Sequence, residues 1–581
     1  MLKKSLQPVC IISALKTSCF IKITGGKMNF FKSGSDILPT DITDRAHTEK
    51  YRDEGVNRRE FLAMASTFGA TTASAYAMLG MSMPALASEN PQPGGTIRIG
   101  MVVRAGKDPR SYDDSPQANI SRGWLEYLVR YTHQFTFEPM LLESWDISED
   151  AKTYVLNVRR GVTWHNGDRL TAEHVAYNIA RWCEKDFEGN SMAARFGTLI
   201  DPETNKAAEG AIEVVDGMTV RLNLPKPDIT LIAGMADYPA AIVHPSAGSS
   251  DPFLVPMGTG PYTLESHEVG LKSVLVRKEG HKWWNEGNGA YLDRIEYIDV
   301  GTDPTIIVAS YEAEEIDANY ETSGDFVDVL ARLDLEKNEA VTAATIVLRT
   351  NQNTEVNGRK PYTDVRVRRA LSMAVDNKVL LELGVNGLGI TAQNHHVCPI
   401  HPEYAEVDRI PYDPEGAMTL LKEAGMEDYE HELISIDDDW RKNTTDAMAG
   451  QLRDAGIKVK RSIVPGASFW NDWAKFPFSS TNWNMRPLGV QILALAYRSG
   501  EAWNETGFES SEFDDLLEKA LATADTVRRR EIMARLESIM LEEGVVTQPY
   551  WRSLYNHNRP NVKGMGMHPT FEIHMDKIWL S

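Results

Sequence analysis

Alternation of apolar and polar residues predicts β-strands at several points along the chain. The alternating segments are 96–100, 153–159, 211–215 and 219–224. The glycine pair Gly94-Gly95 precedes the first segment, which is typical of a half-buried strand that opens a fold. Asp216-Gly217 separates the last two segments and favours a hairpin turn between them.

Apolar residues at helical spacing predict several α-helices. The predicted segments are 124–131, 172–182, 365–375, 415–424 and two helices within 513–540. Thr171 precedes the second of these helices, and Asp413 followed by Pro414 is a helix-start signal before the fourth. Because strands and helices are mixed along the chain, we expect α/β sheets with helices packed on them.

The N-terminal segment has the pattern of an export signal. Arg58-Arg59 precedes an uncharged run rich in small residues, which ends in Ala85-Leu86-Ala87. A twin arginine, a mildly apolar run and a small-x-small motif predict export to the periplasm by the twin-arginine pathway, with cleavage near Ala87. The alternative is a membrane anchor, since the run is long enough to cross a bilayer of about 30 Å.

Residues 1–87 are accordingly left out of the expected fold. The true start of translation stays open between Met1 and Met28, because residues 1–27 look foreign to the signal.

Length and charge narrow the class of protein. A chain of 581 residues with 42% hydrophobic content divides its core among more than one folding unit. The net charge of −21 disfavours nucleic acid and anionic lipid as partners. A protein that handles small molecules is the better interpretation.

Catalytic signatures are missing from the sequence. It contains no G-x-S-x-G elbow, no phosphate-binding loop that ends in Gly-Lys-Ser/Thr, no H-E-x-x-H and no G-x-G-x-x-G. We therefore expect no enzymatic activity and no cofactor, with a secreted hydrolase as the alternative from another class.

An ordered set of motifs resembles the peptide/nickel/opine family of extracytoplasmic solute-binding proteins, which serve ABC importers and include dipeptide- and oligopeptide-binding proteins. The motifs stand in the family's order over nearly the whole chain that follows the leader. They are 94–100, Leu142-Glu143-Ser144-Trp145, 154–168, 258–262, 362–371, 374–376, 401–402, 411–414, 422–425 and 503–506.

The resemblance implies two α/β lobes that close over a ligand by a hinge motion. It places the crossovers near 347–351 and 548–551, so that lobe I is 93–347 with 549–581 returning to it and lobe II is 348–548. It implies a periplasmic monomer that captures a peptide or peptide-like solute and delivers it to permease subunits in the inner membrane. A sugar, an opine or a metal chelate is the alternative ligand.

The resemblance also indicates residues for ligand contact. Trp483 matches the tryptophan at the entry of the family's pocket loop, although core packing is an alternative for it. In dipeptide-binding relatives an aspartate in this loop receives the α-amino group, whereas residues 483–491 contain no carboxylate here. Gly489 stands near that aspartate's place, and Asn484 and Trp124 complete this set of candidates.

Arg486 adds a positive charge to the same loop. If its guanidinium faces the cleft, it suits a carboxylate or phosphonate on the ligand. The ligand would then not be an ordinary dipeptide held by its free amine. The alternative is that Arg486 points to solvent or pairs with a carboxylate of the scaffold.

A cluster of imidazoles and a thiol lies at His395, His396, Cys398 and His401. These groups suit transition metals, but neighbouring residues of an extended segment point to opposite faces. We expect His395 to line the ligand cleft and predict no metal site, while metal binding by this cluster stays open. For Cys183 and Cys398 we expect two buried thiols, with a disulfide as the alternative.

Overall fold

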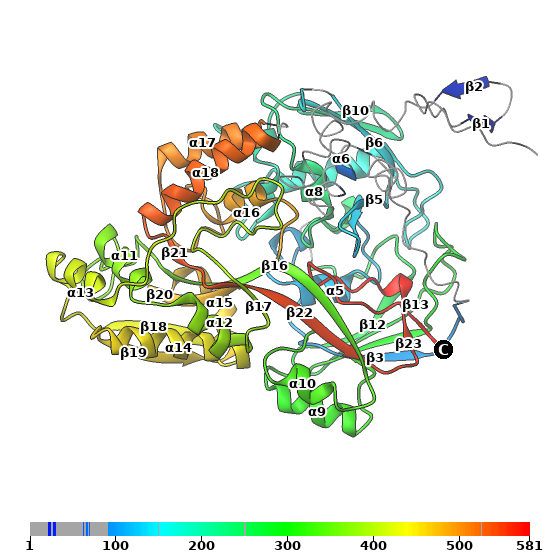
Figure 1. The fold of residues 1–581 in the computed structure, drawn as a ribbon. Coiled ribbons are helices and arrows are strands. Elements are labelled where there is room, and N and C mark those ends of the chain that lie inside the picture. Colours follow the sequence, from blue (N-terminus) through cyan, green and yellow to red (C-terminus); the bar gives the residue numbers. More distant parts are fainter. Residues whose placement is uncertain are drawn as a thin grey trace, which may run out of the picture.

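A computed structural model describes residues 91–581, apart from 149, 249–250 and 524–525, together with 21–24, 27–30, 62, 66–67 and 69. The predicted export residues Arg58, Arg59 and Ala87 lie outside the described residues. The fold is a two-lobed α/β structure, as predicted (Figure 1). Among the described residues, none of the helices is both long and apolar enough to span a bilayer.

A twelve-stranded sheet runs through both lobes in the order β12-β13-β14-β3-β15-β22-β16-β20-β18-β19, with β17 added to β22 and β21 to β16. Its strands are β3 (Thr96–Gly100), β12 (Tyr262–Glu268), β13 (Lys272–Arg277), β14 (Arg294–Ile298), β15 (Ala318–Asn319), β16 (Glu336–Thr350), β17 (Gly389–Thr391), β18 (His431–Ile436), β19 (Val459–Val464), β20 (Phe478–Trp483), β21 (Val546–Thr547) and β22 (Tyr550–Asn558). The predicted first strand is confirmed as β3.

The long strands β16 and β22 connect the two halves of the sheet. They pair antiparallel from Glu336↔Asn558 to Thr345↔Trp551. From Thr345 onward the other edge of β16 pairs with β20. In Figure 1 the two strands run diagonally from the helices α11 to α14 toward β3 and β12. The crossovers predicted near 347–351 and 548–551 fall at one end of this pair, and the lobe limits stay a prediction.

The remaining strands form small sheets. A four-stranded sheet has the order β10-β11-β7-β6 and contains the predicted strand 153–159 and the predicted hairpin. These strands are β6 (Leu142–Ile147), β7 (Thr153–Val158), β10 (Ile212–Asp216) and β11 (Thr219–Asn223); the pairs are β4 (Val129–Tyr131) with β5 (Phe137–Pro139), β8 (Ile200–Asp201) with β9 (Lys206–Ala207), β23 (Val562–Lys563) with β24 (Trp579–Leu580), and β1 (Ile21–Thr24) with β2 (Lys27–Phe30).

Most of the predicted helices are confirmed. The α-helices of the described chain are α5 (Ser115–Ser121), α6 (Ala172–Trp182), α7 (Met192–Arg195), α8 (Leu231–Ala236), α9 (Pro304–Glu312), α10 (Phe326–Leu330), α11 (Val365–Met373), α12 (Asn377–Val385), α13 (Pro414–Glu423), α14 (Asp439–Asp454), α15 (Gly466–Asp472), α16 (Gly489–Ala496), α17 (Ser511–Leu521) and α18 (Thr526–Glu542). Asp413 caps α13 by accepting a hydrogen bond from the Gly416 amide at 2.9 Å. The stretch 513–540 consists of two helices, as predicted.

The helix predicted over 124–131 is wrong. Trp124 lies in a turn after α5, and Val129–Tyr131 is strand β4. The backbone carbonyls of Gly123 and Trp124 accept hydrogen bonds from Tyr262 and Gly260, so a neighbouring loop takes the place of helical partners. A Cβ atom at Gly258 would lie 1.8 Å from the carbonyl oxygen of Trp124. The glycines of the 258–262 motif therefore allow this close backbone approach.

Buried residues form two main cores. One contains β16, α11 to α14 and neighbouring residues of lobe II; the other contains lobe I together with buried residues of α16, α17 and α18. Arg368, which belongs to the 362–371 motif, is buried and paired with Glu543 at 2.8 Å. Cys183 and Cys398 are buried thiols that form no disulfide in the described structure, as predicted.

Candidate functional site

A cavity lies between the two lobes, beside the strands that connect them. It encloses about 1360 Å³ of empty space, part of it open to solvent. Lobe I contributes the end of β3, the start of α5 and the segments 300–307 and 320–330. Lobe II contributes the end of β18, the start of α14, the end of β20 and three further tryptophans, and Phe571 comes from the C-terminal segment.

Aromatic side chains form one wall of the cavity. The five tryptophans are Trp440, Trp470, Trp473, Trp483 and Trp503. The Trp473 ring centroid lies 6.1 Å from that of Trp483, which lies 5.7 Å from that of Trp503. Across the space, Tyr320 and Phe571 are stacked at 5.3 Å. Such ring faces suit a ligand with substantial apolar surface.

Trp483 is held rigidly at the end of β20. Its indole nitrogen donates a hydrogen bond to Glu505 Oε1 at 2.8 Å. The same oxygen accepts from Thr481 Oγ1 at 2.5 Å, and Glu505 Oε2 pairs with Arg349 Nε at 2.7 Å. Both oxygens of the Glu505 carboxylate therefore have protein partners. Glu505 orients Trp483 and has no oxygen left for a ligand.

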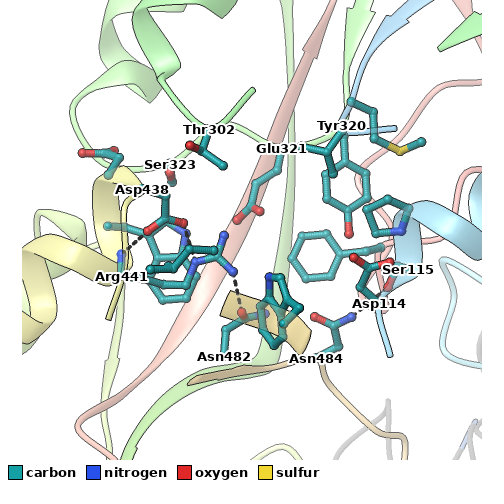
Figure 2. A pocket seen from close by; sticks show the side chains of 18 of the residues that line it. Asp114, Ser115, Thr302, Tyr320, Glu321, Ser323, Asp438, Arg441, Asn482 and Asn484 are labelled. Carbon is teal, nitrogen blue, oxygen red and sulfur yellow. Dashed lines mark hydrogen bonds and ion pairs between the residues drawn. The ribbon is translucent and has the colours of Figure 1, made fainter. Parts of the chain in front are cut away.

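The start of α14 brings charged groups to the cavity, beside the tryptophans. Asp438 caps the helix and forms an ion pair with Arg441, whose Nη1 donates to Asn482 Oδ1 at 2.5 Å. Glu321 points into the same space (Figure 2) and pairs with Arg552 at 2.5 Å. Beneath them, the guanidinium of Arg552 lies 3.8 Å from the Trp440 ring centroid.

Asp439 is the carboxylate of this group that has no cationic partner. Its Oδ1 accepts from Asn443 at 3.1 Å, whereas its Oδ2 is buried without a hydrogen bond in the described part of the chain. Burial, followed by the charges of Asp438 and Asp325, raises the pKa of Asp439 to about 6. A cationic or hydrogen-bond-donating ligand group would complete its environment.

A further polar group lies at the start of α5. Asp114 pairs with Arg104 Nε at 2.6 Å, and the Arg104 guanidinium lies 5.7 Å from the Trp470 ring centroid. Burial raises the pKa of Asp114. The hydroxyl of Ser115 accepts a hydrogen bond from Asn484 Nδ2 at 2.8 Å, which joins the two lobes at the cavity edge.

Three of the predicted ligand contacts line the cavity: Trp483, Asn484 and Arg486. The guanidinium of Arg486 is buried, with Nε 2.8 Å from Asp237 Oδ2. The alternative foreseen for this residue, pairing with a scaffold carboxylate, is therefore what the structure contains. Asp237 also pairs with Arg195 at 2.6 Å, so one carboxylate serves two cations and this end of the cavity keeps a positive charge.

The other three predicted contacts, Gly489, His395 and Trp124, are absent from the lining of this cavity. Gly489 begins α16, where a Cβ atom would lie 2.7 Å from Val397 Cγ1. His395 is buried, with Nδ1 3.6 Å from Glu537 Oε2. Trp124 is buried edge-on against Phe253 at 5.3 Å. These three residues pack in the interior of the protein. The prediction missed this because sequence spacing does not reveal which buried residues face a cavity.

The imidazoles of the 395–401 segment have separate protein partners. His396 Nδ1 lies 2.6 Å from the Tyr497 hydroxyl, and His401 Nε2 donates to the Arg486 carbonyl at 3.1 Å. His401 Nδ1 accepts from the Cys398 amide at 3.0 Å. Within the described residues, this segment does not bring three potential ligand atoms together.

Sequence reasoning missed the charged groups at the start of α14. A visible signal was the run Asp437-Asp438-Asp439, which directly follows strand β18 and begins a helix. Glu321 carried no such signal, because its position opposite α14 depends on the tertiary structure.

Comparison with known families gives one extended match. Residues 136–504 match the family described as "Bacterial extracellular solute-binding proteins, family 5 Middle". The chain is 25% identical over 469 residues to heme-binding protein A of Haemophilus influenzae, covering 74% of this chain and 81% of that protein. It is also 25% identical over 472 residues to di/tripeptide-binding protein 1 of Pseudomonas aeruginosa, covering 74% and 83%.

Solved structures share the fold. The oligopeptide-binding protein AppA of Bacillus subtilis, in complex with a nonapeptide, superposes with a TM-score of 0.74 at 19% identity, covering 85% of this chain and 100% of AppA. The binding protein AgaA of A. tumefaciens R10, in complex with agropinic acid, has a TM-score of 0.74 at 20% identity and covers 84% of this chain and 99% of AgaA.

Proposed function

The chain belongs to family 5 of the bacterial extracellular solute-binding proteins, and we propose that it captures a peptide or peptide-like solute as the substrate-binding component of an ABC importer. One observation carries the proposal: the tryptophan-lined cavity between two lobes that β16 and β22 connect. Its aromatic walls, with polar groups at a few points, suit a small organic ligand that has apolar surface.

The charges of the cavity support a ligand with two unlike ends. Asp439 has no cationic partner in the described chain. At the Arg486 end, the single negative charge of Asp237 is shared by Arg486 and Arg195, which leaves an excess positive charge there. Between them the tryptophans offer flat apolar faces. A peptide-like compound with a cationic group, an apolar side chain and an anionic group meets all three features, and a sugar, an opine or a metal chelate is the alternative.

The remaining parts of the proposal rest on the sequence. We infer export through Arg58 and Arg59 with cleavage near Ala87, and action in the periplasm as a monomer. The lobes are proposed as 93–347 with 549–581, and 348–548. The delivered ligand would pass to permease subunits of the inner membrane, and the protein itself would not turn it over.

The first experiment identifies the ligand and tests its site. Native mass spectrometry of protein purified from its own host is expected to detect a bound small molecule, whose affinity is then measured by calorimetry. Trp473→Ala should weaken binding about 10-fold or more, since it removes about 1.4 kcal/mol or more of contact from the cavity wall. Trp284→Ala is the matched control, because Trp284 is also half-buried but lies outside the cavity lining.

The proposal fails on either of two results. One is equal affinity of Trp473→Ala and Trp284→Ala for the identified ligand. The other is turnover of a panel of chromogenic esters and peptides by the purified protein, which would favour a secreted hydrolase.

A further inference from the structure

A cluster of three histidines lies in lobe I and does not line the ligand cavity. His133 lies between β4 and β5, and His568 and His574 belong to the segment between β23 and β24. One ring nitrogen from each lies within 4.8 Å of the other two. In the part of the chain that the structure describes, this is the one such group of three potential metal ligands.

Hydrogen bonds fix the tautomers of two of these imidazoles. His568 Nε2 lies 3.2 Å from the Tyr131 carbonyl oxygen, and His574 Nε2 lies 2.9 Å from Glu572 Oε2. Since a carbonyl and a carboxylate only accept hydrogen bonds, both Nε2 atoms donate and both Nδ1 atoms keep their lone pairs. Donation of the far nitrogen to a carbonyl or a carboxylate is the usual arrangement of a metal-bound histidine.

The third imidazole offers a free nitrogen. His133 Nε2 is buried and has no hydrogen-bond partner among the described residues. Its ring centroid lies 4.6 Å from that of His568 and 5.6 Å from that of His574.

We propose that His133, His568 and His574 bind a transition-metal ion, with Zn²⁺ as the reference ion. Three neutral imidazoles are a known ligand set for zinc, and Ni²⁺ and Cu²⁺ favour the same nitrogen donors. Glu572 supports the site by orienting His574. Thr570 donates hydrogen bonds to His568 Nδ1 from its hydroxyl at 2.9 Å and from its amide at 3.2 Å, and a bound metal ion would take the place of these donors.

The site would fasten the C-terminal segment to the β4–β5 hairpin. That segment carries Phe571, which lines the ligand cavity and stacks on Tyr320. The Phe571 carbonyl accepts a hydrogen bond from Asn119 Nδ2 at 2.8 Å, so the segment already has one anchor in α5. One metal ion bound by His568 and His574, which flank Phe571 in the sequence, would hold this part of the cavity wall in place.

Metal content and coordination test the proposal. Untagged protein is stripped with a chelator, loaded with Zn²⁺ and dialysed. We expect elemental mass spectrometry to find one zinc ion per chain. The X-ray absorption spectrum should show imidazole nitrogens at Zn–N distances of about 2.0–2.1 Å. His133→Gln and His574→Gln should each weaken zinc binding by about 100-fold or more, and Glu572→Gln by about 10- to 100-fold.

Two control variants make the test specific. His267→Gln changes a partly buried imidazole elsewhere in lobe I, and His396→Gln changes the 395–401 segment. Both should retain one zinc per chain. Any of three results would overturn the proposal. The wild type binds no zinc, the variants His133→Gln and His574→Gln keep full occupancy, or His396→Gln alone loses its zinc. If the variants of the three histidines do not fold, the X-ray absorption spectrum of the zinc-loaded wild type tests the proposal. A zinc ion without imidazole ligands would exclude the site.

Discussion

Arg486 shows how the role of one charged residue depends on its neighbours. Its place in the loop after Trp483 suggested a contact for an anionic ligand group, and its side chain does line the cavity. However, its guanidinium is already paired with Asp237, which also binds Arg195. The contact with ligand therefore stays a prediction, now for a cation that shares its counterion.

Replacing Arg486 by alanine should weaken binding of a ligand that has an anionic group. A charged hydrogen bond is worth about 1.5–3 kcal/mol, which corresponds to a loss of about 10- to 150-fold in affinity. Calorimetry with the identified ligand measures this, and Arg486→Lys, which keeps the charge, should lose less. Unchanged affinity in the alanine variant would remove Arg486 from the binding site.

Asp439 predicts a pH dependence of stability. Its folded-state pKa of about 6 lies above the ordinary value of 3.8, so the folded protein binds this proton more tightly than the unfolded chain. The contribution of Asp439 to stability therefore falls as pH rises from about 4 to about 6. Asp439→Asn should be more stable than wild type above pH 6, and this advantage should shrink toward pH 4.

Thermal unfolding at several pH values measures this difference. Asp454→Asn is the control, because it removes an exposed carboxylate from the other end of α14. A midpoint difference between Asp439→Asn and wild type that does not change with pH would contradict the assignment.

At the level of elements, prediction succeeded where the signal was local. Asp413 and Pro414 begin α13, and Asp216-Gly217 turns between β10 and β11, because capping and turn formation involve only nearby backbone. The segment 124–131 has apolar residues at helical spacing, but the 258–262 loop occupies its carbonyls. Spacing alone cannot separate a helix from a segment that is buried by distant chain.

The whole molecule is expected to change shape on binding. The hydrogen bond from Asn484 to Ser115 joins the two lobes at the cavity edge, and β16 and β22 are the strands that pass between the lobes. Hinge closure should bring these sides together around the ligand. Small-angle X-ray scattering should give a smaller radius of gyration with saturating ligand than without it.

A solute that calorimetry shows not to bind is the control for this measurement, and it should leave the radius unchanged. Equal radii with and without a bound ligand would mean that capture does not need lobe closure.

The sequence by itself indicated the α/β class, most helices and strands, the family, and three residues that line the cavity, although their contact with a ligand stays a prediction. These follow from local periodicity, capping and ordered motifs, which are written in neighbouring residues. Only the tertiary structure decided which charges meet. Asp237 serves both Arg195 and Arg486, Asp439 has no cationic partner in the described chain, and His133 lies beside His568 and His574. Residues hundreds of positions apart set the burial and the partners of each group, and these two factors determine what its side chain can bind.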